Sequence, residues 1–167
     1  MLTLLHKHRS RKLLLLTVVL VTSALTGCEF STNFSFSDKQ QVPQAPKLQD
    51  MSIEQLLPFA KKGNLEAQYQ LASNYEARFF FNNAFKWYEK AAEKGHADSQ
   101  LSLGYLYYFG RGADVDQKMA FRWFTKAAQK NDTYAQSWLG VLLRDGEGTP
   151  INLKQAFQWF AKAAGQG

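Results

Sequence analysis

Few side chains in this 167-residue sequence could carry out nucleophilic or acid–base chemistry. Cys28 is the only cysteine, so it cannot form an intramolecular disulfide, and His96 is the only histidine after residue 27. The sequence therefore contains almost no residues from which a nucleophile–histidine–acid arrangement or a histidine-rich metal site could be built. The sequence also lacks a Ser-x-x-Lys motif, which argues against a serine acyl-enzyme. We predict no catalytic residue, no cofactor and no metal site.

Two Gly-x-Gly segments, at residues 110–112 and 146–148, have a composition that is also found in phosphate-binding loops. No strand is expected before either segment, and neither is followed by Lys-Ser or Lys-Thr. Both are explained more simply as turns that end a helix, where glycine readily takes a positive φ angle. We predict a structural role for His96 as well, because it stands at an expected turn between two helices.

Cys28 follows a segment with the features of an export signal. Residues 6–12 are basic, and residues 13–25 form an uncharged apolar run that is shorter than the ~20 residues needed to cross a bilayer. The run ends in Leu25-Thr26-Gly27-Cys28, which resembles the bacterial lipobox. The resemblance implies that residues 1–27 are a lipoprotein signal peptide and that Cys28 is lipidated and becomes the new N-terminus. The alternative is an ordinary buried or free thiol.

The residue after the cysteine bears on the location of the protein. In the lipoprotein family an Asp at this position commonly retains the protein in the inner membrane, and here the position holds Glu29. The resemblance therefore favours a lipid anchor in the outer membrane, facing the periplasm. Residues 28–50 are polar, contain Pro43 and Pro46, and are predicted to be a flexible tether that reaches about 25 Å on average.

The net charge of +6 comes mainly from the N-terminal segment. Four basic residues lie within the first 27 positions, which contain no Asp or Glu, so the rest of the chain has 16 basic and 14 acidic residues. A balance of +2 gives weak support to a nucleic-acid surface, and we predict no nucleic-acid partner.

The dominant feature of the remaining sequence is a block that occurs three times. It reads Ala-Phe-x-Trp, an aromatic residue, x-Lys-Ala-Ala, and its tryptophans at positions 87, 123 and 159 are 36 residues apart. A fixed period of this length is typical of one helical unit copied along a solenoid. Before each block stands a Leu-Ala or Leu-Gly pair, at residues 71–72, 103–104 and 139–140, within a helical pattern. The small residue predicts close approach of the partner helix.

The block, the Leu-Gly pairs, the Gly-x-Gly loops and the expected helix caps Asp116 and Asn152 resemble the Sel-one-like repeat (SLR) family, which is related to tetratricopeptide repeats. The resemblance implies an all-α fold: an α/α solenoid of about three SLR helix pairs preceded by a capping helix. We expect a half-repeat at 51–64, which begins with a possible capping box at Ser52 and Gln55, and repeats at 65–96, 97–132 and 133–167.

The resemblance also implies a function, a scaffold that binds a protein or peptide partner through the first helices of its repeats. Groove positions of tetratricopeptide repeats, carried onto this sequence, are Glu66, Tyr69, Ser73 and Glu76; Asp98, Leu101, Tyr105 and Tyr108; Tyr134, Ser137, Val141 and Arg144. Some of these tyrosines could instead cover the neighbouring repeat. Two other functions stay open: a β-lactam or cell-wall-active enzyme, since some cysteine-rich SLR proteins are linked to β-lactams, and a purely structural envelope component.

Two places depart from the repeat pattern. Repeat one lacks four residues and both loop glycines, and Arg78-Phe79-Phe80-Phe81 stands in their place, either filling the space under a tight loop or contacting a partner. The last helix carries Phe157, Phe160 and Ala164, and no further helix is expected after it. We therefore expect fraying, self-association or partner docking at that end.

Overall fold

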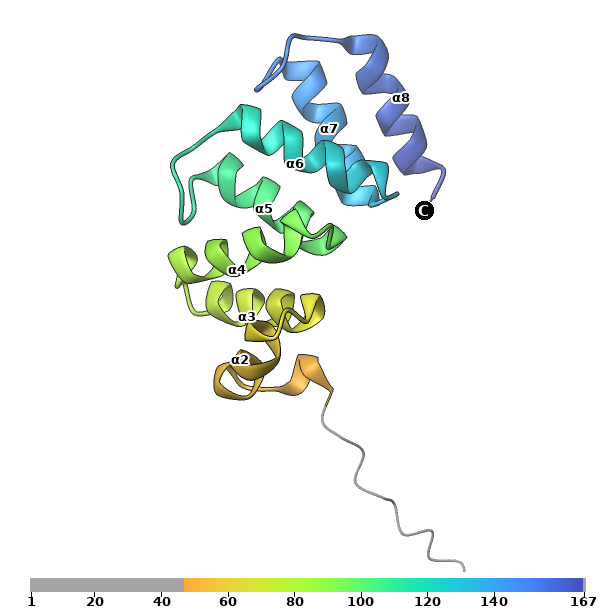
Figure 1. Ribbon diagram of the computed structural model, residues 1–167. Helices are drawn as coiled ribbons and strands as arrows, with labels where there is room; N and C mark the ends of the chain where they lie inside the picture. The colour runs from red at the N-terminus through yellow and green to blue at the C-terminus, as the bar shows by residue number, and fades with distance from the viewer. Residues whose placement is uncertain (1–46, 167) are drawn as a thin grey trace, which may run out of the picture. The chain divides into compact units, whose positions relative to one another are not determined.

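The computed structural model describes residues 47–166, in which it places seven α-helices, one short 3-10 helix and no strand (Figure 1). The elements are η1 Leu48–Asp50, α2 Ile53–Lys61, α3 Leu65–Ala77, α4 Phe81–Glu93, α5 Ala97–Phe109, α6 Gln117–Gln129, α7 Thr133–Asp145 and α8 Leu153–Ala164. The predictions for the signal peptide and for lipidation of Cys28 lie outside the described residues. None of the helices between residues 47 and 166 is long and apolar enough to cross a membrane.

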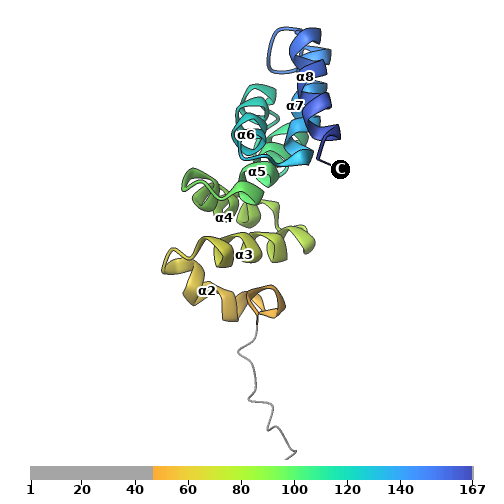
Figure 2. The same ribbon diagram turned by 90° about the vertical axis from the view of Figure 1, so that its right-hand side faces the viewer.

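The helices pack in chain order within a compact unit that spans residues 44–167. Each helix from α3 to α7 contacts the helix before it and the helix after it, so α3–α4, α5–α6 and α7–α8 form three successive hairpins behind α2 (Figures 1 and 2). This arrangement confirms the predicted all-α solenoid of three helix pairs and a capping helix. The packed part begins slightly earlier than expected, because Leu48 in η1 contacts the cluster of apolar side chains between α2 and α3.

Side chains at the helix starts explain where the helices begin. Ser52 and Gln55 form the expected capping box on α2, and Asp116 and Asn152 cap α6 and α8 by accepting hydrogen bonds from backbone N–H groups. The first helices of the three hairpins, α3, α5 and α7, are capped in the same way by residues that the sequence did not single out as caps. These are Asn64 on α3, His96 on α5 and Asp132 on α7.

The two glycines of the Leu-Gly pairs mark close helix contacts in the last two hairpins. A Cβ atom on Gly104 would lie 2.7 Å from the Phe124 ring, and one on Gly140 would lie 2.8 Å from the Phe160 ring. The predicted close approach is confirmed. Glycine costs helix propensity but lets an aromatic ring lie directly on the helix backbone.

The Gly-x-Gly segments are turns with positive φ, as predicted. Gly146 is the left-handed cap of α7 with a φ of 77°, and Gly148 has a φ of 70°. A Cβ on Gly148 would overlap the carbonyl group of Gln117 and lie 2.8 Å from the backbone nitrogen of Lys118. The loop between α7 and α8 is therefore docked on the start of α6.

Three buried glutamines join each hairpin to the helix that precedes it, and the sequence patterns did not reveal them. Gln68, Gln100 and Gln136, here called the inter-repeat glutamines, occupy equivalent buried positions in α3, α5 and α7. Their Nε2 atoms donate hydrogen bonds to the carbonyl oxygens of Ala60, Ala92 and Ala128, at 2.9, 3.0 and 3.2 Å. Each acceptor lies in the helix that precedes the glutamine's own helix, so each bond links one repeat to the previous one.

The aromatic segment of repeat one is only partly buried. Phe81 packs into the core between α3 and α4, whereas Phe80 is exposed and Phe79 is 79% exposed. Phe79 has a φ of 62°, a left-handed conformation that is unusual for a bulky residue. Of the two explanations expected for these aromatic residues, filling the space under a tight loop therefore accounts for Phe81 only.

Helix α8 is regular through Ala164, and one side of it is uncovered. Phe157 is 73% exposed and Ala164 is exposed, whereas Phe160 is half-buried against α7. The equivalent Phe124 of the preceding repeat is fully buried. The difference arises because no later helix packs on α8 within the described part of the chain.

Candidate protein-binding face

The twelve predicted groove residues lie on α3, α5 and α7, the first helices of the hairpins. All twelve are exposed or half-buried, whereas Leu103, Gly104 and Leu106 of α5 are buried. The side of the first helices that bears the twelve residues is called the first-helix face below. Two clusters on it have distinct chemistry.

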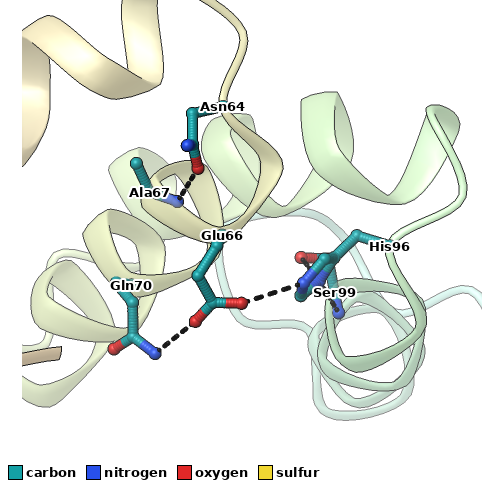
Figure 3. Close-up of polar contacts among 6 residues, drawn as sticks. All are labelled: Asn64, Glu66, Ala67, Gln70, His96 and Ser99. Atoms are coloured by element: carbon teal, nitrogen blue, oxygen red, sulfur yellow. Dashed lines mark hydrogen bonds and ion pairs between the residues drawn. The ribbon is translucent and has the colours of Figure 1, made fainter. Parts of the chain in front are cut away.

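The first cluster joins α3 to α5 through Glu66. Its carboxylate accepts a hydrogen bond from Gln70 at 2.8 Å and lies 3.4 Å from Nε2 of His96, so it is held from both helices (Figure 3). The Nδ1 atom of His96 faces the other way and accepts the backbone N–H of Ser99 at 3.3 Å. His96 thus has the structural role expected of it, as the cap of α5 and a contact between repeats.

Tyrosine rings fill the space beside this carboxylate. The Tyr69 ring lies 5.2 Å from the His96 ring and 5.8 Å from the Tyr88 ring, measured between centroids. Tyr88 is buried and donates its hydroxyl to Glu76 at 2.9 Å. Tyr88 belongs to the repeated block and was not among the predicted groove residues, although its hydroxyl bonds to one of them, Glu76.

Carboxylates surround the tyrosines of the first cluster. Burial, followed by the charges of Asp98, Glu66 and Glu76, raises the pKa of Tyr69 above its ordinary value. Tyr88 has a raised pKa as well, chiefly because of burial and then because of Glu76. Both phenols are therefore uncharged hydrogen-bond donors at neutral pH, beside carboxylates that favour a cationic ligand.

The second cluster is aromatic and joins α5 to α7. The Tyr105 and Tyr108 rings lie 5.4 and 5.0 Å from the Trp138 ring, in edge-to-face arrangements. Trp138 in turn stacks on the buried Phe124. Both tyrosines therefore partly cover the neighbouring repeat, which was one of the two roles expected for them. Both also remain half-exposed, as the other role, partner binding, requires. Interaction with the Glu147 carboxylate, then burial, raises the pKa of Tyr108.

Trp138 is the main residue of this face that the sequence reasoning missed. It directly precedes the Leu139-Gly140 pair, where the other repeats carry Gln70 and Ser102. This change from a polar residue in the first two repeats to tryptophan in the third could have indicated that Trp138 belongs to the face. The remaining α7 positions differ in character, since Tyr134 is 71% exposed and Arg144 binds the neighbouring Asp145 through two hydrogen bonds of 2.6 and 2.7 Å.

The face offers recognition groups and no evident catalytic arrangement. Between residues 47 and 166, no group of three or more His, Cys, Asp or Glu side chains is placed to hold a metal ion. The geometry provides carboxylates in the first cluster, half-exposed tyrosines beside Trp138 in the second, and helices beneath both. Such surfaces are suited to binding a polypeptide segment.

Comparisons with known proteins agree with this architecture. A Sel1 repeat protein from Oxalobacter formigenes is 27% identical, with a TM-score of 0.66 over 74% of this chain and 97% of that chain. The protective antigen c5321 of uropathogenic Escherichia coli, which displays an SLR fold, is 25% identical, with a TM-score of 0.52 over 70% of this chain and 34% of that chain. Cysteine-rich protein B of Helicobacter pylori shares the fold at 24% identity, with a TM-score of 0.56 over 69% and 88% of the two chains.

No protein among those with curated functions matches this sequence. The family model of the Sel1 repeat, by contrast, matches residues 65–79, 81–96, 97–132 and 133–167, which together make up more than half of the chain. The protein therefore belongs to the Sel1 repeat family.

Proposed function

We propose that this protein is a lipid-anchored scaffold of the bacterial envelope, which uses its first-helix face to bind a protein partner in the periplasm. Sel1 repeat proteins generally mediate protein–protein interactions, and their fold is typically a non-catalytic scaffold. The observation that carries the proposal is the half-exposed tyrosine cluster around Trp138 beside the carboxylates of α3 and α5. Tyrosine supplies contact area and a polar tip at the centre of many interfaces.

The two clusters define the chemistry of the partner. Glu66, Glu76 and Asp98 favour a segment with Lys or Arg side chains, whereas Tyr105, Tyr108 and Tyr134 favour apolar side chains next to it. An extended segment that is basic at one end and apolar at the other fits both clusters at once. Crosslinking in intact cells followed by mass spectrometry would identify the protein that contains it.

Replacing Tyr108 and Tyr134 by alanine should weaken binding of the crosslinked partner more than tenfold, because each ring is an exposed or half-exposed anchor. Titration with the purified partner measures the loss. Tyr105 is less suitable for this test, since its ring also packs on Phe124 and its removal would disturb the core. The matched control is Phe157→Ala, which removes an exposed ring from α8 and should leave affinity unchanged. Normal binding by the double variant would exclude this face as the site.

Anchoring through Cys28 is supported by the lipobox-like sequence and is tested separately. Cells labelled with a fatty-acid analogue should show label on the wild-type protein and none on the Cys28→Ser variant, because acylation requires the sulfur. We further expect the wild type in the outer-membrane fraction. Equal labelling of both proteins would contradict the proposal. Turnover of the chromogenic β-lactam nitrocefin by the purified protein would instead support the alternative of a β-lactam-active enzyme.

A further inference from the structure

The second helices of the hairpins carry a repeated strip of basic side chains. In each repeat four positions are spaced by four residues; the first three lie on the second helix and the fourth lies just after its end, and each position recurs 36 residues later in the next repeat. The resulting twelve positions are 82, 86, 90 and 94; 118, 122, 126 and 130; 154, 158, 162 and 166. Nine hold Lys or Arg, three hold Asn or Gln, and none holds an acidic residue. This set is called the basic strip.

The basic strip is available to a ligand. All twelve side chains are exposed, and none of the nine cations forms an ion pair within residues 47–166. Lys90 and Lys126 are held over the rings of Trp87 and Trp123, at 4.4 and 3.8 Å from the ring centroids, so part of the strip has a fixed geometry. Lys130 also donates a hydrogen bond to the carbonyl of Gly95.

Charge is segregated between the two sets of helices. Helices α6 and α8 contain five cations and no acid, whereas α3, α5 and α7 together contain four acids and one cation. On α4 the cations are accompanied by Glu89 and Glu93, so the excess of positive charge lies on α6 and α8, the second helices of the last two hairpins. The net charge outside the first 27 residues is only +2, but cations and acids are thus unevenly distributed between the second and the first helices.

Helix α8 adds apolar groups beside its cations. Leu153 and Phe157 lie one turn apart and are 65% and 73% exposed, next to Lys154 in the sequence, and Ile151 just before the helix is 65% exposed. Exposed Leu and Phe side chains that flank a lysine row are typical of helices that lie in the headgroup region of a bilayer.

We propose that the basic strip of α6 and α8 rests on an anionic phospholipid bilayer, with Leu153 and Phe157 entering the headgroup region. Charge complementarity favours this occupant, because the strip continues over two repeats without an acidic interruption. The biological setting rests on the proposed lipid anchor, whose tether of about 25 Å would keep the unit near the membrane. Docking in this way would orient the acidic first helices away from the lipid, where a periplasmic partner can reach them.

The test uses residues 28–167 with Cys28→Ser, which contain the whole compact unit at 44–167 and no acyl chain. This protein should cosediment with vesicles of phosphatidylglycerol and phosphatidylcholine and not with vesicles of phosphatidylcholine alone. Added salt should weaken the binding. The triple variant Lys118→Glu, Arg122→Glu, Lys126→Glu should lower the partition coefficient at least about a hundredfold, because each cation near an anionic surface contributes to binding and each carboxylate opposes it.

The matched control is Lys47→Glu, Arg78→Glu, Arg111→Glu, which changes the net charge equally at exposed positions outside the basic strip. It should reduce partitioning by less than about fivefold, since charges far from the surface are screened. Circular dichroism verifies folding, and a milder Lys118→Gln, Arg122→Gln, Lys126→Gln variant replaces the first if that one unfolds. Equal losses in variant and control, or equal binding to neutral vesicles, would overturn the proposal, as would self-association through α8 without vesicle binding. Because the assay contains no partner and no acyl chain, its outcome is independent of the tests of the proposed function.

Discussion

Replacement of Gly148 by alanine is expected to lower the free energy of unfolding by about 2–5 kcal/mol, a large part of the stability of a small domain. Two effects add. Gly148 has a φ of 70°, which costs an alanine roughly 1–2 kcal/mol, and the new Cβ would overlap the carbonyl group of Gln117. Since the neighbour is backbone and not a flexible side chain, relief requires the α7–α8 loop to leave α6, at a further cost of about 1–3 kcal/mol.

Urea unfolding followed by circular dichroism would measure the change. The control is Gly165→Ala, because Gly165 has a φ of −74° and a Cβ there would lie 3.5 Å from its nearest neighbour, an ordinary contact. That variant should stay within about 0.5 kcal/mol of the wild type. If Gly148→Ala proves equally neutral, the loop does not dock on α6 in solution.

A second large effect is expected for Phe124→Ala, which should cost about 3–5 kcal/mol because the ring is fully buried between α5, α6 and α7. Phe160→Ala offers the matched comparison. Phe160 lies on Gly140 as Phe124 lies on Gly104, but its ring is only half-buried, so its loss should cost roughly 1–2 kcal/mol.

Thermal and urea unfolding of both variants would give the difference. Equal losses would mean that Phe160 is covered in solution by something that residues 47–166 do not supply. Sedimentation of the wild type would then decide whether a second copy covers it. The two phenylalanines occupy the same position in the repeated block Ala-Phe-x-Trp-Phe-x-Lys-Ala-Ala and differ in what packs over them.

The repeat period predicted most of the fold, because a hairpin that cannot bury its apolar side alone must stack on its neighbours. Local chemistry predicted the details that depend on one residue type: an Asp or Asn before a helix, and a small residue where an aromatic ring must approach. The conformation of Phe79 could not be predicted, since that residue takes a left-handed backbone conformation near the place where the other two loops use glycine.

The candidate site was less predictable than the fold. Register alone placed Tyr105 and Tyr108 on the side of α5 away from Leu103, and the burial of α5 follows that register. Their contact with Trp138 depends on how one repeat rotates against the next, which no single-helix pattern contains. The hydrogen bond from Tyr88 to Glu76 lies within one hairpin and depends on how α4 packs against α3, which no single-helix pattern contains either.

The inter-repeat glutamines bear on how the number of repeats in this protein can change during evolution. Each donates to an alanine carbonyl at the same place in the preceding helix, so the donor of any hairpin matches the acceptor of any other. Loss of residues 97–132 would bring Gln136 to Ala92 in place of Ala128, and duplication of that segment would create one more identical pair. Whole repeats can therefore be gained or lost by recombination without leaving a buried amide donor unsatisfied, so the number of repeats is free to evolve.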